Sequence, residues 1–220
     1  MTEFWIEEKP LPGIDATVES LRASRWLGDS TLNGPFQASR GFAFTFRRSG
    51  IQALLGEEPA LRSFVERALA PTVRRRLLGS WARWIKRVPN LFYLNVLVVP
   101  PGTSVEPHVD ATLREPTGIH DLVPEMVSVA HLVAPPGGQL ELARGSRPLA
   151  TLETRQGRVL HYRGELIHGV RTVDDNTRIS RLSLVCEHYR VPESVSEHFL
   201  PLRIHSQRRF QNLVVEPGVR

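Results

Sequence analysis

The chain contains 220 residues, of which 41% are hydrophobic, and its formal net charge is +5. This length and composition support a sizeable core, and we expect one domain spanning residues 1–220. No apolar run reaches the roughly 18 residues of a membrane-spanning helix, and the charged opening MTEFWIEEKP differs from a secretory signal, so we expect a cytoplasmic protein without membrane association. Because Cys186 is the single cysteine, an intramolecular disulfide and a cysteine-based metal site are excluded.

The positive charge comes almost entirely from arginine, since Lys9 and Lys86 are the only lysines among 28 basic residues. A basic chain can attract nucleic acid. Here the arginines are spread along the whole sequence, which is more typical of genome composition than of one binding surface. Nucleic acid is therefore not an expected partner, and the sequence leaves the oligomeric state open.

The first 90 residues are expected to form a helix-rich support region. Apolar residues at helical spacing predict helices over about Asp15–Ala23, Glu58–Leu69 and Thr72–Arg87. Between the first two helices, three phenylalanines alternate with smaller residues and predict a strand over Gly41–Arg47.

From residue 91 to 190 the sequence changes to short β-rich runs separated by Gly- and Pro-containing turns. Several short strands without helices between them favour an antiparallel sandwich or barrel over a parallel α/β sheet. The fold expected is therefore mainly β with flanking α-helices, followed by an extension over 191–220 whose end could form a strand or a helix. The predicted strands cover residues 91–99, 126–134, 138–143, 157–163, 166–173 and 179–190.

The stretch EPHVDAT contains an imidazole and a carboxylate two residues apart. In an extended segment, His108 and Asp110 project to the same side. A mononuclear iron(II) site with two histidines and one carboxylate needs one further histidine. His168 fits best, because it lies on a predicted strand after a Gly-bounded turn. The remaining candidates are in loops, at strand ends, in the tail or on strands of undefined orientation, namely His120, His131, His161, His188, His198 and His205.

Four blocks in a fixed order resemble the iron(II) and 2-oxoglutarate-dependent oxygenases, in particular their prolyl 4-hydroxylase-like branch. The blocks are VVPPGTSVEPHVD, GGQLEL, GRVLHYRGELIHGV and TVDDNTRIS, within residues 91–190. The resemblance implies a double-stranded β-helix, the cupin-like jelly roll of two facing antiparallel sheets.

The same resemblance implies residue roles. His108, Asp110 and His168 would bind iron and form the catalytic centre. The arginine that holds 2-oxoglutarate is either Arg178 or Arg181. Arg178 is preferred, because its distance from His168 and the residues around it resemble this branch most. Arg181 also has the Arg-x-Ser form. A planar guanidinium suits this task because it pairs with a carboxylate through two parallel hydrogen bonds.

One position departs from the pattern of many relatives. They carry a tyrosine ahead of the Pro-Gly turn as a second co-substrate contact, where this chain has Val99. Tyr93 and Asn95 lie on the same face of that predicted strand, so either could supply the missing polar group. The alternative is that both belong to the edge of the core.

The activity implied is hydroxylation of an unactivated C–H bond, with Fe(II), O₂ and 2-oxoglutarate, which is decarboxylated to succinate. The substrate expected is a small polar molecule, an amino acid or a peptidyl residue, and the segment 111–125 could be either its lid or an ordinary solvated loop. Two alternatives are a cupin-like metalloenzyme that does not use 2-oxoglutarate and a catalytically silent jelly-roll binding module.

Overall fold

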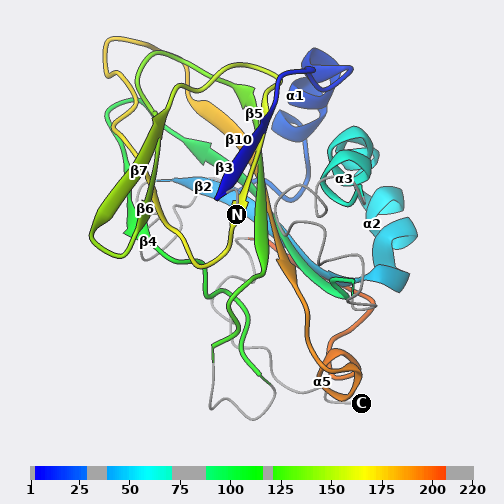
Figure 1. Cartoon of the computed structure of the whole chain (residues 1–220). Helices are drawn as coiled ribbons and strands as arrows, with labels where there is room; N and C mark the ends of the chain where they lie inside the picture. The colour runs from blue at the N-terminus through cyan, green and yellow to red at the C-terminus, as the bar shows by residue number, and fades with distance from the viewer. Residues whose placement is uncertain (1–2, 29–38, 71–87, 116–120, 207–220) are drawn as a thin grey trace.

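The computed structural model describes residues 3–28, 39–70, 88–115 and 121–206, and these form two antiparallel sheets that face each other (Figure 1). The larger sheet has the strand order β1-β8-β5-β10-β3-β2-β11, and the smaller sheet has the order β4-β9-β6-β7. The strands of the larger sheet are β1 (Phe4–Glu7), β2 (Arg40–Arg47), β3 (Leu91–Val99), β5 (Met126–Val133), β8 (Val159–Arg163), β10 (Arg181–Tyr189) and β11 (Leu202–His205). Those of the smaller sheet are β4 (Val105–His108), β6 (Leu140–Arg144), β7 (Arg147–Leu152) and β9 (Ile167–Val170).

Three helices, α1 (Ile14–Arg22), α2 (Ile51–Glu57) and α3 (Arg62–Ala68), cover the outer face of the larger sheet (Figure 1). The 3₁₀ turns η2 (Arg48–Gly50) and η3 (Pro59–Leu61) precede α2 and α3, and a short helix α5 (Glu193–Ser196) follows β10. The helices lie on this face because alternate residues of β2 and β3 give it a continuous apolar surface, to which Phe42, Phe44, Phe46, Phe92, Leu94, Val96 and Val98 contribute.

The opposite face of β3 points between the two sheets. Leu97 and Val99 pack there against Leu140 and Leu142 of the smaller sheet. Every position of β3 is buried, so this strand is largely apolar on both faces rather than alternating, with Asn95 as its one amide side chain. The core is thus divided into an outer part beneath the helices and an inner part inside the jelly roll.

The main predictions from the sequence are confirmed in this fold. It is mostly β with flanking helices, and the strands predicted from residue 91 onward are present with small shifts at their ends. The helix predicted at 15–23 is α1, and the strand predicted at 41–47 is β2. The helix predicted at 72–87 lies outside the described residues.

Other elements differ from the prediction. The helix predicted at 58–69 begins as the 3₁₀ turn η3, a form that is frequent at helix N-termini, and α3 starts only at Arg62. The tail, left open between strand and helix, contributes β11 at the edge of the larger sheet. The sequence missed α2 and the short strands β1, β4 and β7. All of these strands lie at sheet edges, where pairing partners distant in sequence define them.

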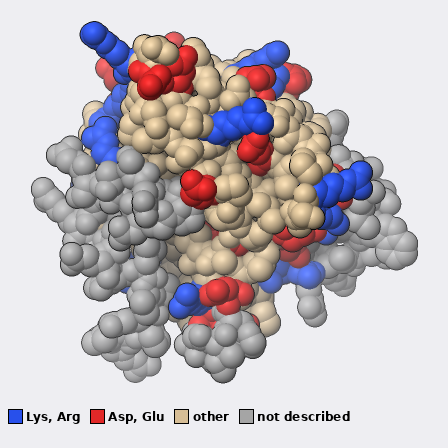
Figure 2. All heavy atoms as spheres, turned by 90° about the vertical axis from the view of Figure 1, so that its left-hand side faces the viewer, with Lys and Arg blue, Asp and Glu red and all other residues tan. Residues whose placement is uncertain are grey.

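Charges of both signs are interspersed on the face shown in Figure 2. Many arginines of the described residues pair with carboxylates, and several of these pairs join segments far apart in the sequence. Examples are Arg25–Glu57, Arg144–Glu3, Arg158–Glu8, Arg171–Glu141 and Arg190–Glu125. Within the described part of the chain, no helix is both long and apolar enough to cross a membrane.

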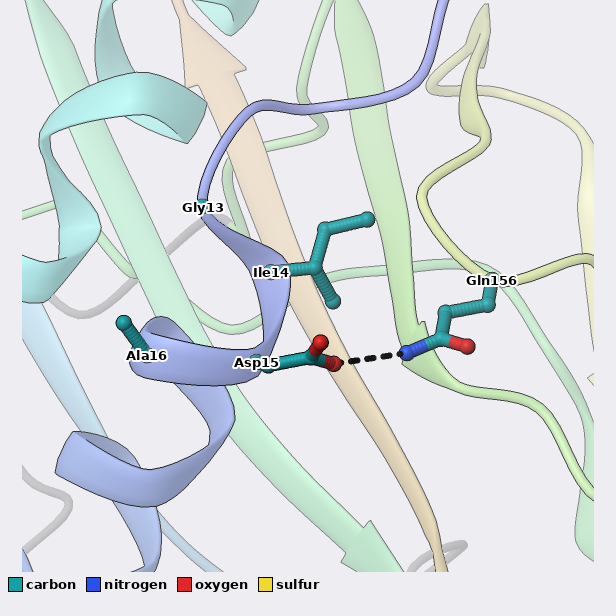
Figure 3. Close-up of a pocket in the computed structure, with 5 residues that line it drawn as sticks. All are labelled: Gly13, Ile14, Asp15, Ala16 and Gln156. Carbon is teal, nitrogen blue, oxygen red and sulfur yellow. Dashed lines mark hydrogen bonds between the residues drawn. The ribbon is translucent and has the colours of Figure 1, made fainter.

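The start of α1 lies beside the loop that leads into β8. Gly13 precedes the helix with a positive φ of 66°, and no side chain caps its first turn. Asp15 accepts a hydrogen bond of 3.5 Å from Gln156, and these residues line a shallow depression (Figure 3). The contact joins the N-terminal helix to the jelly roll.

A buried polar network lies on the helix-covered face of the larger sheet. Ser128 Oγ is 2.8 Å from His161 Nδ1 and 3.0 Å from His188 Nε2. The Nε2 atom of His161 lies 3.4 Å from Glu7, which also accepts a hydrogen bond of 2.5 Å from Arg67. The network therefore connects β1, β5, β8 and β10 with α3.

We expect this network to make folding sensitive to acid. Burial, together with the charges of His161 and Arg48, lowers the pKa of His188 to about 3, and burial also lowers the pKa of His161 although Glu7 opposes the shift. In the unfolded chain both histidines titrate near pH 6.5. Below that pH the unfolded state therefore binds more protons than the folded state, and the folded state loses stability relative to it. The free energy of unfolding should be highest above about pH 6.5 and should decrease by a few kcal/mol as the pH falls toward 4.

Urea unfolding between pH 7 and pH 4, with a chelator present to remove any contribution from bound metal, measures this dependence. The variant His188→Gln, which does not titrate in this range, should show a smaller decrease than the wild type. A free energy of unfolding that stays constant or rises on acidification would contradict the expectation.

Candidate metal centre

Two histidines lie side by side on neighbouring strands of the smaller sheet. Strands β4 and β9 pair antiparallel with His108 opposite His168, and the centroids of the two imidazole rings are 4.4 Å apart. A Cβ atom at Gly169 would lie 3.0 Å from the carbonyl oxygen of Val105 and 3.2 Å from Pro107. Glycine at this position therefore lets β4 approach β9 closely enough to bring the imidazoles together.

Asp110 completes the group from the segment after β4. Its Oδ1 is 3.5 Å from His108 Nε2, and its Oδ2 is 3.5 Å from His168 Nε2. One ligand atom from each of the three side chains lies within 4.8 Å of the others, which is close enough for all three to reach a single ion. Among the described residues, this is the one group of three His, Cys, Asp or Glu side chains with ligand atoms close enough to hold a metal.

Backbone carbonyls orient both imidazoles. The Nδ1 atom of His108 is 2.7 Å from the carbonyl oxygen of Glu106, and Nδ1 of His168 is 3.2 Å from that of Leu166. Because a carbonyl only accepts hydrogen bonds, Nδ1 carries the proton and the lone pair of Nε2 points toward Asp110. This is the arrangement that metal-binding histidines adopt.

The three side chains are also electrostatically suited to a cation. Burial opposes ionisation of Asp110, but the two imidazoles outweigh it and hold the pKa of this carboxyl below its usual range. Burial favours the neutral form of His108, yet the Asp110 carboxylate and the Glu106 carbonyl raise its pKa. The group thus presents a carboxylate with two imidazoles to one buried point, which is the ligand set of a facial iron(II) site.

The two candidate arginines occupy different environments. Arg178 lies in the segment before β10 and is exposed, whereas Arg181 is the first residue of β10 and only 2% exposed. Burial lowers the pKa of Arg181 to about 10, so the guanidinium remains charged at neutral pH. Its Nη2 lies 3.3 Å from His131 Nδ1, and no carboxylate among the described residues pairs with it.

Further polar atoms near Arg181 are buried without a hydrogen-bond partner in the described residues. They are Arg181 Nε, Ser183 Oγ and Tyr162 OH. Tyr162 interacts electrostatically with Arg181, and its ring centroid is 5.1 Å from that of His168. Because buried polar groups are almost always hydrogen-bonded, this cluster of polar side chains matches a polar, anionic ligand that reaches from the metal ligands toward Arg181.

The sequence did not assign a role to Tyr162. Its position next to His161, in the strand that precedes His168, could have suggested a role. Both faces of that strand carry polar residues, however, so the sequence did not show which face points inward. Pairing of β8 with β5 places Tyr162 opposite Val127, on the inner side of the sheet.

Tyr93 and Asn95 lie inside the jelly roll, as their alternation with Val99 predicted. In the pairing of β3 with β10, Val99 is opposite Arg181 and Tyr93 is opposite Glu187. Asn95 is four residues from Val99, which corresponds to about 13 Å along a strand. The structure therefore does not bring Tyr93 or Asn95 together with Arg181, but places Asn95 opposite the middle of β10 and Tyr93 toward its other end.

The segment after Asp110 folds back over this end. The hydroxyl of Thr112 donates a hydrogen bond of 2.8 Å to Glu187, and Arg114 forms an ion pair of 2.8 Å with Asp121. Leu113 is buried. Residues 116–120 of the predicted lid, including His120, lie outside the described residues.

Comparisons with known proteins identify the architecture. No family model and no curated protein matches the sequence. The structure, however, is similar to a prolyl-4-hydroxylase from Pseudomonas putida, with a TM-score of 0.58, 17% identity and coverage of 86% of this chain and 94% of that chain. The chain has the fold of the 2-oxoglutarate and iron(II) oxygenases.

Two further structures support this assignment of fold. An oxidoreductase of the 2OG-Fe(II) oxygenase family from Burkholderia pseudomallei gives a TM-score of 0.55 and 17% identity, and covers 86% of each chain. A prolyl hydroxylase from Trichoplax adhaerens, in complex with a peptide fragment of the hypoxia inducible factor oxygen degradation domain, gives 0.56 and 15% identity, with coverage of 89% of this chain and 86% of that one. The resemblance seen in the four sequence blocks is thus confirmed at the level of the oxygenase fold.

Proposed function

We propose that this protein is an Fe(II)- and 2-oxoglutarate-dependent dioxygenase that hydroxylates an unactivated C–H bond of a small polar molecule, an amino acid or a peptidyl residue. One observation carries the proposal. A His-Asp-His group with the spacing of a metal site and a buried guanidinium without a carboxylate partner occur inside the same oxygenase fold. A metal site alone would fit many enzymes, but this pairing fits a metal-chelating dicarboxylate.

In this proposal His108, Asp110 and His168 hold the iron. Bound there, Fe(II) with 2-oxoglutarate and O₂ would supply the oxidising power for C–H cleavage, while 2-oxoglutarate is converted to succinate and CO₂. The protein contributes orientation, because the carbonyls of Glu106 and Leu166 direct both imidazoles toward one point. It also contributes exclusion of water, since Asp110 and His168 are 4% and 7% exposed.

For the distal carboxylate of 2-oxoglutarate we propose Arg181 rather than Arg178, which the sequence had favoured. The burial of Arg181 and the exposure of Arg178 support this choice, because a buried guanidinium without a carboxylate is costly unless a ligand provides one. Ser183 and Tyr162 have the unpaired polar atoms that could add hydrogen bonds to the same carboxylate. They replace Tyr93 and Asn95 in the role that the missing tyrosine has in relatives.

The peptide-bound structure of the Trichoplax prolyl hydroxylase supports a peptidyl residue as one substrate class. The two alternative functions lack this support. A metalloenzyme without 2-oxoglutarate would have no use for the buried, unpaired Arg181, and a silent binding module would not need the three oriented metal ligands.

Binding of 2-oxoglutarate tests the proposal without knowledge of the substrate. Calorimetry on the Mn(II)-loaded protein should show stoichiometric binding of 2-oxoglutarate. After a chelator has removed the metal, the same titration should show at least tenfold weaker binding, because one end of the ligand would no longer contact a metal ion. Succinate release from the Fe(II) protein with amino acids and peptides then identifies substrates. Metal-independent binding, or none, would exclude 2-oxoglutarate as co-substrate.

A further inference from the structure

Glu187 is a buried acid near the end of β10 that is distant from Arg181. It is 3% exposed and lies on the same inner face of the strand as Arg181, since six residues separate them. Six residues of a strand span about 20 Å, whereas the four C–C bonds of 2-oxoglutarate, at about 1.5 Å each, span at most about 6 Å. A co-substrate held by Arg181 therefore does not reach Glu187.

No cation among the described residues neutralises Glu187. Its carboxyl accepts hydrogen bonds from Thr112 and from the hydroxyl of Tyr189, but no Arg, Lys or His among the described residues forms an ion pair with it. Burial raises the pKa of Glu187, and the nearby charge of Asp110 raises it further, whereas a cation bound beside the carboxyl would favour its ionised form. A carboxylate has about four acceptor sites, so the two bonds leave room for further donors.

The surroundings of Glu187 favour an organic cation. Tyr93 lies opposite Glu187 in the pairing of β3 with β10, and Tyr189, the next residue on the same face of β10, donates a hydrogen bond from its hydroxyl to Glu187, so two tyrosines adjoin the acid. Asn95 is one step further along the same face of β3 and is 8% exposed, and its buried Oδ1 has no hydrogen-bond partner among the described residues. Acceptor oxygens and aromatic faces together bind N–H-rich cations.

We propose that Glu187 selects a substrate with a positively charged ammonium or guanidinium group, which it binds on the side of the metal centre away from Arg181. This inference rests on the proposed function and narrows its substrate class. Thr112 connects the acid to the segment that leaves Asp110, and Glu187 and Asp110 interact electrostatically. The bound cation would thus lie beside the metal ligands, where the C–H bonds near the charged group could be presented for oxidation.

Paramagnetic relaxation by Mn(II) bound at the centre tests this position with simple probes. With 2-oxoglutarate present, n-butylammonium and methylguanidinium are compared with n-butanol, a neutral molecule of the same length as the first. We expect at least one cation to bind about tenfold more tightly than n-butanol, as its Mn(II)-induced proton relaxation reports, which corresponds to about 1.4 kcal/mol. Equal relaxation of cations and n-butanol would overturn the proposal.

Two variants locate the effect. Glu187→Gln keeps the shape and removes the charge, and should abolish most of the preference for the cation. The matched control Glu141→Gln, on the exposed side of β6, should retain it. An undiminished preference in Glu187→Gln would assign the cation to another group and overturn the proposal. If this variant fails to bind Mn(II), the wild-type comparison of cation with n-butanol decides alone.

The proposed function has its own readout in the same experiment. If the wild-type protein does not bind Mn(II), or if 2-oxoglutarate is not relaxed by it, the metal centre or the co-substrate assignment fails and the inference falls with it. If both bind and the cations do not, only the role of Glu187 is wrong.

Discussion

Replacement of Asp110 by alanine is expected to abolish the conversion of 2-oxoglutarate to succinate. The carboxylate contacts both imidazoles at 3.5 Å and is the only anionic member of the group. Changes to residues that merely support metal ligands already cost 10- to 100-fold in affinity, so loss of this ligand should weaken Fe(II) or Mn(II) binding by more than about 100-fold. Calorimetry with Mn(II) and a succinate assay measure the two effects, and His108→Ala should behave in the same way.

Asp15→Ala provides a matched control, because Asp15 lies on α1 and contacts Gln156 outside the centre. This variant should bind Mn(II) like the wild type. Unchanged succinate production by Asp110→Ala would disprove the ligand assignment, whereas unchanged folding with lost metal binding would support it. Removal of the metal by a chelator should reproduce the phenotype of Asp110→Ala in the wild-type protein, and added Fe(II) should reverse it.

Replacement of Arg181 by alanine is expected to weaken 2-oxoglutarate binding by about 100-fold. A buried, charge-assisted pair between a guanidinium and a carboxylate contributes about 3 kcal/mol, which corresponds to that factor. Arg178→Ala should change the affinity by less than about twofold, since exposed pairs contribute little. The measurement is calorimetric titration of the Mn(II)-loaded variants with 2-oxoglutarate, and retained Mn(II) binding shows that each variant is folded.

Arg181→Lys tests the geometry of the same contact. Lysine keeps the positive charge but loses the planar fork that makes two parallel hydrogen bonds, so an intermediate affinity is expected. If only Arg178→Ala weakens 2-oxoglutarate binding, the sequence-based preference for Arg178 is correct, and the buried polar groups around Arg181 have another role.

The sequence alone determined the strands of the core and the three candidate metal ligands. Residues two apart on a strand share a side, so His108 and Asp110 form a unit that is visible without a structure. The resemblance of the four ordered blocks to the oxygenases then implied a jelly roll, which the fold confirms. The strands and the His-Asp unit depend on local periodicity and on residue types, both of which are readable in one sequence.

The tertiary structure decided what depends on pairing between distant segments. It paired β4 with β9 and so placed His108 opposite His168, and it put Arg181 inside the jelly roll while Arg178 remained outside. Both arginines have similar neighbours in sequence. They differ because β10 begins at Arg181, which is therefore part of the strand, whereas Arg178 lies before it. The register of β3 and β10 likewise placed Tyr93 beside Glu187 rather than near Arg181. Register is a property of two strands together, because hydrogen bonding between them fixes which side chains meet, and one strand by itself does not contain it.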